Sequence, residues 1–298
     1  MPVETREQKV ARLIEKHVKD RNMDPESIKT HYKVKHTGIE LDPDFFEASL
    51  NVGWGFFTDK PRHLDHMTRN LLISVLLAWR SRPGCYHQGK KGVMMGATYE
   101  QMMEGYEAGS VPGGGPVLIN GMTALRRMMD EGVVPGSQDS PWANKWVQMG
   151  PKEWPVRKVP TGPDGETRTE RIIRLMRHYN LPDAQDLIKD LAYGATLDPD
   201  FFEGYVRVTW TIFDEKQCHL DPVRREMAAL MVLAAQGRRE EVYLGTKRCL
   251  QLGATELQLL EAFEVCANGG GSEILHEGLR ALRRLKGEGS APASGGSK

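Results

Sequence analysis

An internal repeat constrains the fold of this chain more than any other feature of its sequence. Seven residues, LDPDFFE, stand at Leu41–Glu47 and again, letter for letter, at Leu197–Glu203. The segment from Leu64 to Met128 recurs in pattern from Leu220 to Leu285. We call these last two segments the first copy and the second copy. A repeat of this length predicts two versions of one structural unit.

The two copies are not in perfect register. Leu64 aligns with Leu220 at an offset of 156, whereas Gly-Ala-Thr at Gly96 aligns with Gly253 at an offset of 157. One residue was therefore gained or lost in between. This slip lies beside Cys85, which, with its neighbour His87, is the best chemical candidate in the first copy.

Each copy has the pattern of three or four helices. Asp65 and Asp221 are placed as N-caps of an apolar helix, and a second helix ends at Gly-Ala-Thr, where a third begins. A glycine-rich bend at 113–115 precedes a last amphipathic helix. The sequence therefore predicts an all-α protein.

The repeat also suggests domain boundaries. We expect a first domain at residues 1–130, a linker rich in Pro, Gly and Trp at 131–169 and a second domain at 170–286. Residues 287–298 (GEGSAPASGGSK) have the composition of a disordered tail.

Composition narrows the possible partners and compartments. Lys plus Arg and Asp plus Glu each number 40, so no nucleic-acid partner is implied. The charged N-terminus does not resemble a signal peptide and no apolar run is long enough to cross a bilayer, so we expect no membrane association and a cytoplasmic location. The four cysteines lack the spacing of a disulfide framework or a zinc site.

A metal site is not expected from the histidines. His63 and His66 have a spacing that could suit a metal, but the second copy has Pro222 in place of His66 and no third ligand is evident.

Both copies resemble the carboxymuconolactone decarboxylase and AhpD-like superfamily. Both copies have the Gly-x-Thr helix break and the bend of small residues before the last helix, and the second copy also has the Arg-Glu pair on the apolar helix. This resemblance implies two fused all-α domains, the second degenerate in its site, that work without a cofactor. It also implies a homo-oligomer, a dimer or trimer of two-domain chains.

Cys85 and His87 are the first catalytic candidates. The turn at 80–84 delivers Cys85 to the start of a helix, where the helix dipole and nearby Arg80 favour a thiolate. In the second copy Val242 and Leu244 stand at these positions.

The resemblance favours one of the two chemistries of the superfamily. AhpD-like members carry C-x-x-C followed by a histidine on this helix, and Cys85 has no partner three residues away. Decarboxylase-like members keep a histidine about eight residues before the Gly of the helix break, and His87 stands nine before Gly96.

The superfamily also places a glutamate after an arginine on the preceding helix. The second copy keeps this pair as Arg225-Glu226, whereas the first has Arg69-Asn70. Glu226 is a candidate that could approach Cys85 and His87 if the copies pack together; the alternative is a structural ion pair. Glu104 recurs as Glu261, so a structural role competes there with an acid or base role.

We therefore expect a lyase or decarboxylase that performs acid/base chemistry on a small aromatic-derived or lactone carboxylic acid, as in aromatic compound catabolism. His87 would move the proton. Arg69 or Arg80 would hold the carboxylate, and Cys85, Trp54 and Trp79 would line the pocket. Two alternatives stay open: a single-cysteine alkylhydroperoxidase-like antioxidant protein and a non-catalytic ligand-binding scaffold.

Overall fold

A computed structural model describes residues 4–19, 33–57, 62–138, 149, 162–179, 185–213 and 219–289. Within these ranges the regular structure is entirely helical, which confirms the predicted fold class. Two compact units are present, Met1–Pro61 and Arg62–Lys298. The domain boundaries expected from the repeat stay a prediction.

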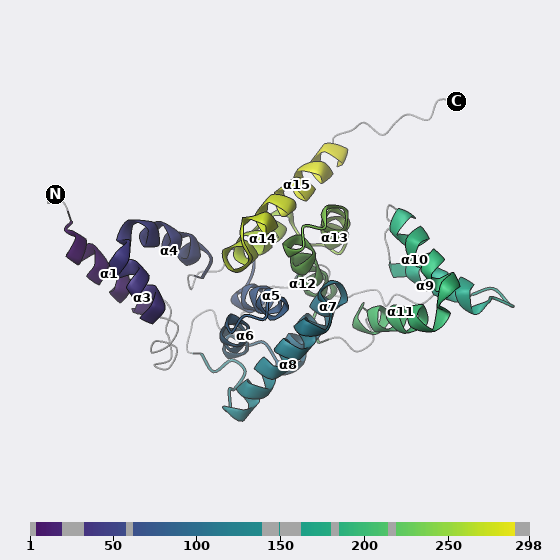
Figure 1. Ribbon diagram of the computed structural model, residues 1–298, viewed down its shortest axis with the longest axis horizontal. Helices are drawn as coiled ribbons and strands as arrows, with labels where there is room; N and C mark the ends of the chain where they lie inside the picture. The colour runs from purple at the N-terminus through teal and green to yellow at the C-terminus, as the bar shows by residue number, and fades with distance from the viewer. Residues whose placement is uncertain are drawn as a thin grey trace. The chain divides into compact units, whose positions relative to one another are not determined.

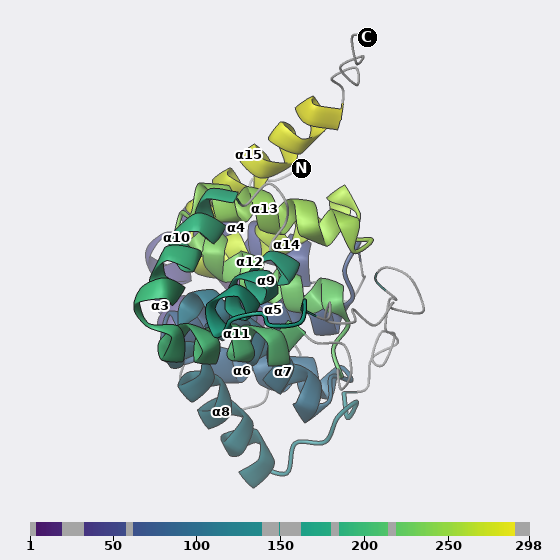
Figure 2. The same ribbon diagram turned by 90° about the vertical axis from the view of Figure 1, so that its right-hand side faces the viewer.

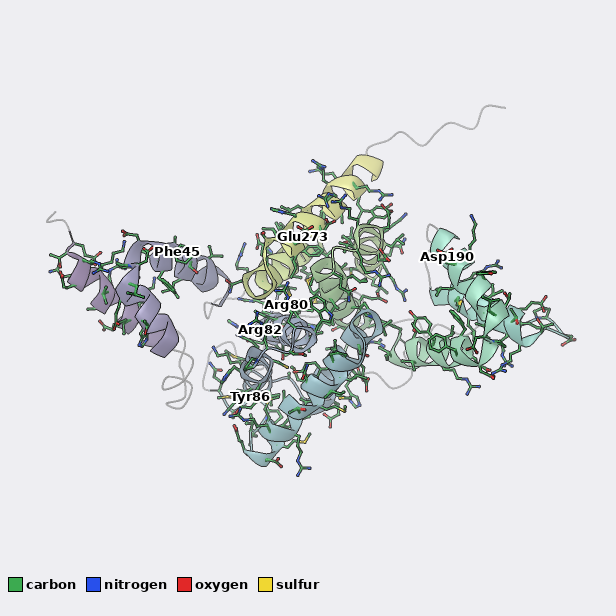
Figure 3. All side chains as sticks on the ribbon, in the orientation of Figure 1. Phe45, Arg80, Arg82, Tyr86, Asp190 and Glu273 are labelled. Atoms are coloured by element: carbon green, nitrogen blue, oxygen red, sulfur yellow. The ribbon has the colours of Figure 1, made fainter. Side chains whose placement is uncertain are left out.

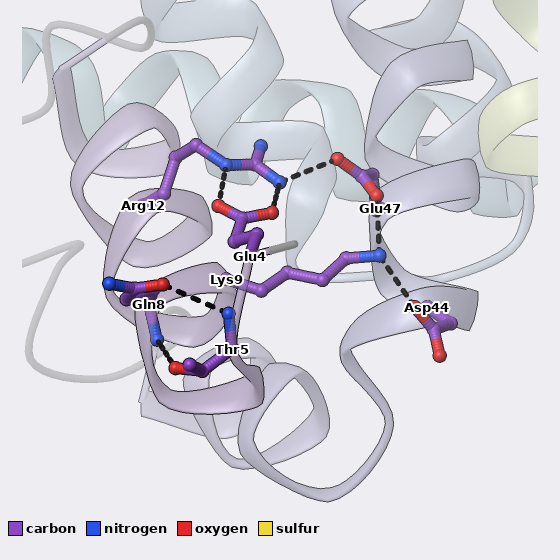
Figure 4. A network of polar contacts seen from close by, with 7 residues as sticks. All are labelled: Glu4, Thr5, Gln8, Lys9, Arg12, Asp44 and Glu47. Atoms are coloured by element: carbon purple, nitrogen blue, oxygen red, sulfur yellow. Dashed lines mark hydrogen bonds and ion pairs between the residues drawn. The ribbon is translucent and has the colours of Figure 1, made fainter. Parts of the chain in front are cut away.

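In the described part of the Met1–Pro61 unit the helices are α1 (Arg6–Lys19), α3 (Lys33–Leu41) and α4 (Pro43–Phe57). A small core of Leu13, Ile39 and Leu50 joins them. A polar network ties the start of α1 to α4 (Figure 4). In it the Arg12 guanidinium binds Glu4 at 2.7 Å and Glu47 at 2.9 Å, and Lys9 reaches Asp44 and Glu47 at 2.5 and 2.6 Å.

The Arg62–Lys298 unit holds the helices of both copies (Figure 1). The helices of the first copy are α5 (His66–Trp79), α6 (Gly84–Met94), α7 (Tyr99–Gly113) and α8 (Gly115–Asp130). Those of the second copy are α12 (Pro222–Ala235), α13 (Arg239–Gln251), α14 (Glu256–Gly270) and α15 (Ser272–Gly289). A three-helix group stands before the second copy: α9 (Arg168–Tyr179), α10 (Gln185–Leu197) and α11 (Pro199–Phe213).

Corresponding helices begin in the same way, as their sequences require. The Asp65 carboxylate accepts a hydrogen bond from the Thr68 backbone N–H, and Asp221 accepts one from that of Arg224. Thr98 and Thr255 each form a capping box with the glutamine three residues later. The predicted N-caps and Gly-x-Thr breaks are therefore confirmed.

One hydrophobic core joins the two copies. It runs without interruption through buried residues of both, from Leu64 to Ala281. Within it α7 packs on α12, and α14 packs on α5. The two apolar helices α5 and α12 lie next to each other inside the bundle (Figures 1 and 2). Each copy thus covers the apolar helix of the other.

Each copy supplies one carboxylate that accepts hydrogen bonds from the backbone of the other copy; we call this pair the reciprocal carboxylates. Glu261 of α14 accepts hydrogen bonds from the backbone N–H groups of His63 and Leu64 at 2.6 and 3.0 Å. Glu104 of α7 accepts the equivalent bonds from His219 and Leu220, both at 2.7 Å. Of the two roles weighed for this pair of glutamates, the structural one is therefore observed.

No helix within the described ranges is both long enough and apolar enough to cross a membrane.

Candidate functional site

Cys85 lies in a closed group of buried polar atoms near the start of α6. Its Sγ is 3.7 Å from the hydroxyls of both Ser74 and Tyr106. Ser74 Oγ donates to the Cys85 carbonyl at 2.8 Å and lies 2.7 Å from Tyr106 Oη. These contacts form a ring in which the thiol, the phenol and the serine hydroxyl satisfy one another.

The protein environment of Cys85 does not favour a thiolate. Its side chain is only 3% exposed, and burial raises the pKa of the thiol, against a smaller lowering effect of the hydrogen bonds with Tyr106 and Ser74. The helix start and the neighbouring arginines predicted a stabilised thiolate. That prediction fails because the thiol lies inside the core and away from water, where the charged form is disfavoured.

His87 projects away from Cys85. Two residues apart on an α-helix are separated by about 200° around the axis, so the side chains leave α6 on nearly opposite sides. The imidazole packs edge-on against the Tyr86 ring, with the ring centres 5.1 Å apart. The structure therefore does not bring the two first-copy candidates together on one surface.

Arg69 is fully buried where the copies meet. Its Nε is 3.3 Å from the Glu261 carboxylate, and its guanidinium also donates to the Leu64 carbonyl. Burial lowers the pKa of Arg69, while the Glu261 charge opposes this shift. The charge of Arg69 is thus balanced inside the protein by a carboxylate of the second copy.

The remaining candidates lie in different surroundings. Arg80 is exposed in the turn after α5 (Figure 3), with its guanidinium 5.7 Å from the centre of the Trp79 ring. Trp79 is partly buried against the core of the Arg62–Lys298 unit. Trp54 belongs to α4 of the Met1–Pro61 unit, and its side chain lies outside the described residues.

Glu226 is the candidate that lies on a cavity. It stands on α12 and is 8% exposed. Its Oε1 is 2.7 Å from Nε of Arg248 on α13. The Nε–H does not point along this line, so the contact is an ion pair rather than an aligned hydrogen bond. Glu226 therefore pairs within its own copy and not with the region of Cys85 and His87.

The cavity has a volume of about 310 Å³ and opens between α7, α9, α10, α11, α12 and α13. Most of its wall is apolar: Val111, Pro112, Met176, Leu191, Val206, Phe213, Ala229, Leu233 and Leu244. Its charged lining groups are Glu226 and Arg248 together with Glu241 and Arg238. This size and composition are typical of small-molecule pockets.

The two ion pairs of the cavity differ in exposure. The side chains of Glu226 and Arg248 are 10% and 15% exposed, whereas those of Glu241 and Arg238 are 28% and 43% exposed. The inner pair thus places one carboxylate and one guanidinium against an apolar wall, and the outer pair stands nearer to water. A ligand with an apolar body and one acidic group matches this arrangement.

Sequence reasoning identified Glu226 but missed Arg248. Arg248 aligns with Lys91 of the first copy at the offset of 157, and a basic residue at both positions was the available signal. The apolar wall gave no comparable signal, because its residues come from six helices that are far apart in the sequence.

A comparison with protein families finds a match for the part of the chain that carries Glu226 and Arg248. Residues 199–284 match the model of the Carboxymuconolactone decarboxylase family. This match covers most of the second copy, which is therefore similar to that family. A search of curated proteins finds no match.

The carboxymuconolactone decarboxylase match runs from α11 into α15 and so includes the helices that carry Glu226 and Arg248. It also includes the cavity wall contributed by α11. The wall formed by Val111 and Pro112 lies outside the match, on α7 of the first copy.

Proposed function

We propose that this protein is a cofactor-independent acid/base enzyme, a lyase or decarboxylase that acts on a small carboxylic acid in the second-copy cavity. The observation that carries the proposal is the Glu226–Arg248 pair on an otherwise apolar wall. The family match supports the class of protein. The substrate and the reaction are our inference.

In this proposal Arg248 binds the carboxylate of the substrate. A guanidinium forms strong charge-assisted hydrogen bonds with a carboxylate, and these are stronger where water is excluded. The Phe213 ring, 5.7 Å from the Arg248 guanidinium, lies on the same wall. The aromatic or lactone ring of the substrate would fill the apolar part of the cavity.

Glu226 is proposed to transfer the proton. A substrate carboxylate on Arg248 competes with Glu226 for the cation and so frees the Glu226 carboxylate to act on the substrate. When the bond to the departing carboxylate breaks, CO₂ leaves and the electron pair is delocalised through the conjugated double bond onto the lactone carbonyl. The conjugated carbons then take a proton that Glu226 relays from water, and Glu226 is a carboxylate again.

Turnover of γ-carboxymuconolactone, followed as release of CO₂, tests this function. Glu226→Gln preserves size but cannot exchange the proton, and we expect at least a ~100-fold loss of kcat. Glu241→Gln, the matched change on the outer pair, is expected to keep kcat within about twofold. Melting curves establish that both variants are folded. Equal rates for wild type and Glu226→Gln would refute the role of Glu226.

The thiol peroxidase alternative has no comparable support. Cys85 is buried and its pKa is raised, whereas such an enzyme needs an accessible thiolate. Turnover of a hydroperoxide that Cys85→Ser abolishes, with no effect of Glu226→Gln, would establish that alternative in place of our proposal.

A further inference from the structure

The first copy closes one side of the second-copy cavity. Val111 and Pro112, in the last turn of α7, belong to its lining. Both are partly exposed, so they form a boundary between the cavity and its opening. The helix that carries them packs along α12, which carries Glu226 (Figures 1 and 2).

This wall is held firmly in place. The side-chain amide of Gln236, just after α12, donates to the Pro112 carbonyl at 2.9 Å. At the next residue, Gly113, a Cβ would stand only 3.1 Å from a methyl carbon of Val232 and 3.1 Å from the Trp79 ring. Because the backbone is packed this closely, the position of the Pro112 ring is fixed by its neighbours.

The corresponding place in the first copy is built differently. Pro112 aligns with Gly269, and Ala229 of the cavity aligns with Ile73. A Cβ at Gly269 would stand 3.1 Å from Ile73 Cδ1, so Ile73 packs directly against that glycine. In the second-copy cavity the side chain on α12 is smaller, the side chain on α7 is larger, and both line the space.

The volume of the cavity can be compared with the volume that aromatic rings need. A cavity of about 150 Å³ binds one benzene ring, so two rings need about 300 Å³. The second-copy cavity measures about 310 Å³, so a two-ring acid would occupy nearly all of it and its far ring would reach the wall that includes Val111 and Pro112.

We propose that Val111 and Pro112 are specificity-determining residues, which restrict the cavity to monocyclic carboxylic acids. This inference rests on the proposed function, because it takes Arg248 as the carboxylate-binding group. The first copy would then contribute substrate selection, and the second copy the charged groups.

Binding of benzoate and of biphenyl-4-carboxylate, measured by isothermal titration calorimetry, tests the inference. We expect wild type to prefer benzoate. Pro112→Ala removes ring atoms and suits a helix, so the affinity ratio should shift by about tenfold toward the two-ring acid, in line with the effect of a methylene in an apolar pocket. Val111→Phe fills space and should shift the ratio in the opposite direction.

Controls separate this inference from the proposed function. Pro116→Ala changes an exposed proline outside the cavity and should leave the ratio unchanged; Val111→Ala provides a second enlarging variant if Pro112→Ala does not fold. A ratio that stays constant across the folded cavity variants, while Arg248→Met weakens both acids, would overturn the inference and leave the function intact. Failure of both acids to bind wild type would overturn both.

Discussion

The burial of Cys85 leads to a prediction about the reactivity of its thiol. Because burial raises the pKa of this thiol, its alkylation should be slow at pH 7 and should still be accelerating above pH ~8.5, the ordinary range of a free thiol. Peptide mapping after timed iodoacetamide treatment measures the rate at Cys85 directly. A rate that has already reached its plateau near pH 6 would reveal an activated thiolate.

Glu131 allows a prediction about how the stability of the protein depends on pH. A hydrogen bond from the Tyr86 hydroxyl, with help from Lys90 and Arg127, lowers the pKa of Glu131 to about 2. A lowered pKa in the folded state stabilises the protein above the ordinary carboxyl pKa, and this contribution disappears as pH falls toward 2.

Urea unfolding of Glu131→Gln and wild type checks this sign. The free-energy difference between them should be constant from pH 5 to 8 and should shrink as pH falls from about 4.5 toward 2. A difference that grows in acid would contradict the assigned direction.

Among the contacts between helices, the carboxylates of Glu261 and Glu104 should contribute unequally to the free energy of unfolding. Glu261 is fully buried and also neutralises the buried Arg69, whereas Glu104 binds only the equivalent backbone groups among its described contacts. Glu261→Gln should cost about 3–5 kcal/mol, since it removes the ion-pair carboxylate of a buried arginine. Glu104→Gln should cost about 1–2 kcal/mol.

Chemical denaturation of the two variants provides the comparison. Equal losses would mean that the pairing of Arg69 with Glu261 contributes nothing beyond the backbone hydrogen bonds. Arg69→Met combined with Glu261→Gln should recover part of the loss, because the buried guanidinium is then absent.

The helices and their starts could be predicted from sequence, because capping is local. Asp65, Asp221, Thr98 and Thr255 each bind a backbone N–H three residues later, and so the signal is contained within one turn. The partner of Glu226 could not be predicted in this way. Arg248 lies 22 residues further along, and only the packing of α12 on α13 brings the two charges together.

For the molecule as a whole, the shared core means that the two copies should fold as one unit. Arg224 of the second copy is fully buried and donates to Thr68 and Asp65 of the first at 2.6 and 2.5 Å. The repeat alone did not predict these contacts between the copies, because repeated patterns are equally compatible with two separate cores.

Separated copies should therefore not fold alone. Fragments 62–138 and 162–289, expressed apart, should lack a cooperative thermal transition, and mixing them should restore one. Circular dichroism of each fragment and of the mixture measures this. A cooperative transition in 162–289 by itself would mean that the second copy is an independent domain.

In the proposed function the second-copy cavity, rather than the surroundings of Cys85 and His87, binds the acid. Titration of isotope-labelled protein with benzoate, followed by the backbone amide resonances in nuclear magnetic resonance, locates the binding site. We predict that the shifted resonances belong to the Glu226–Arg248 segment and to Val111 and its neighbours. Shifts confined to α6, around Cys85 and His87, would contradict the account.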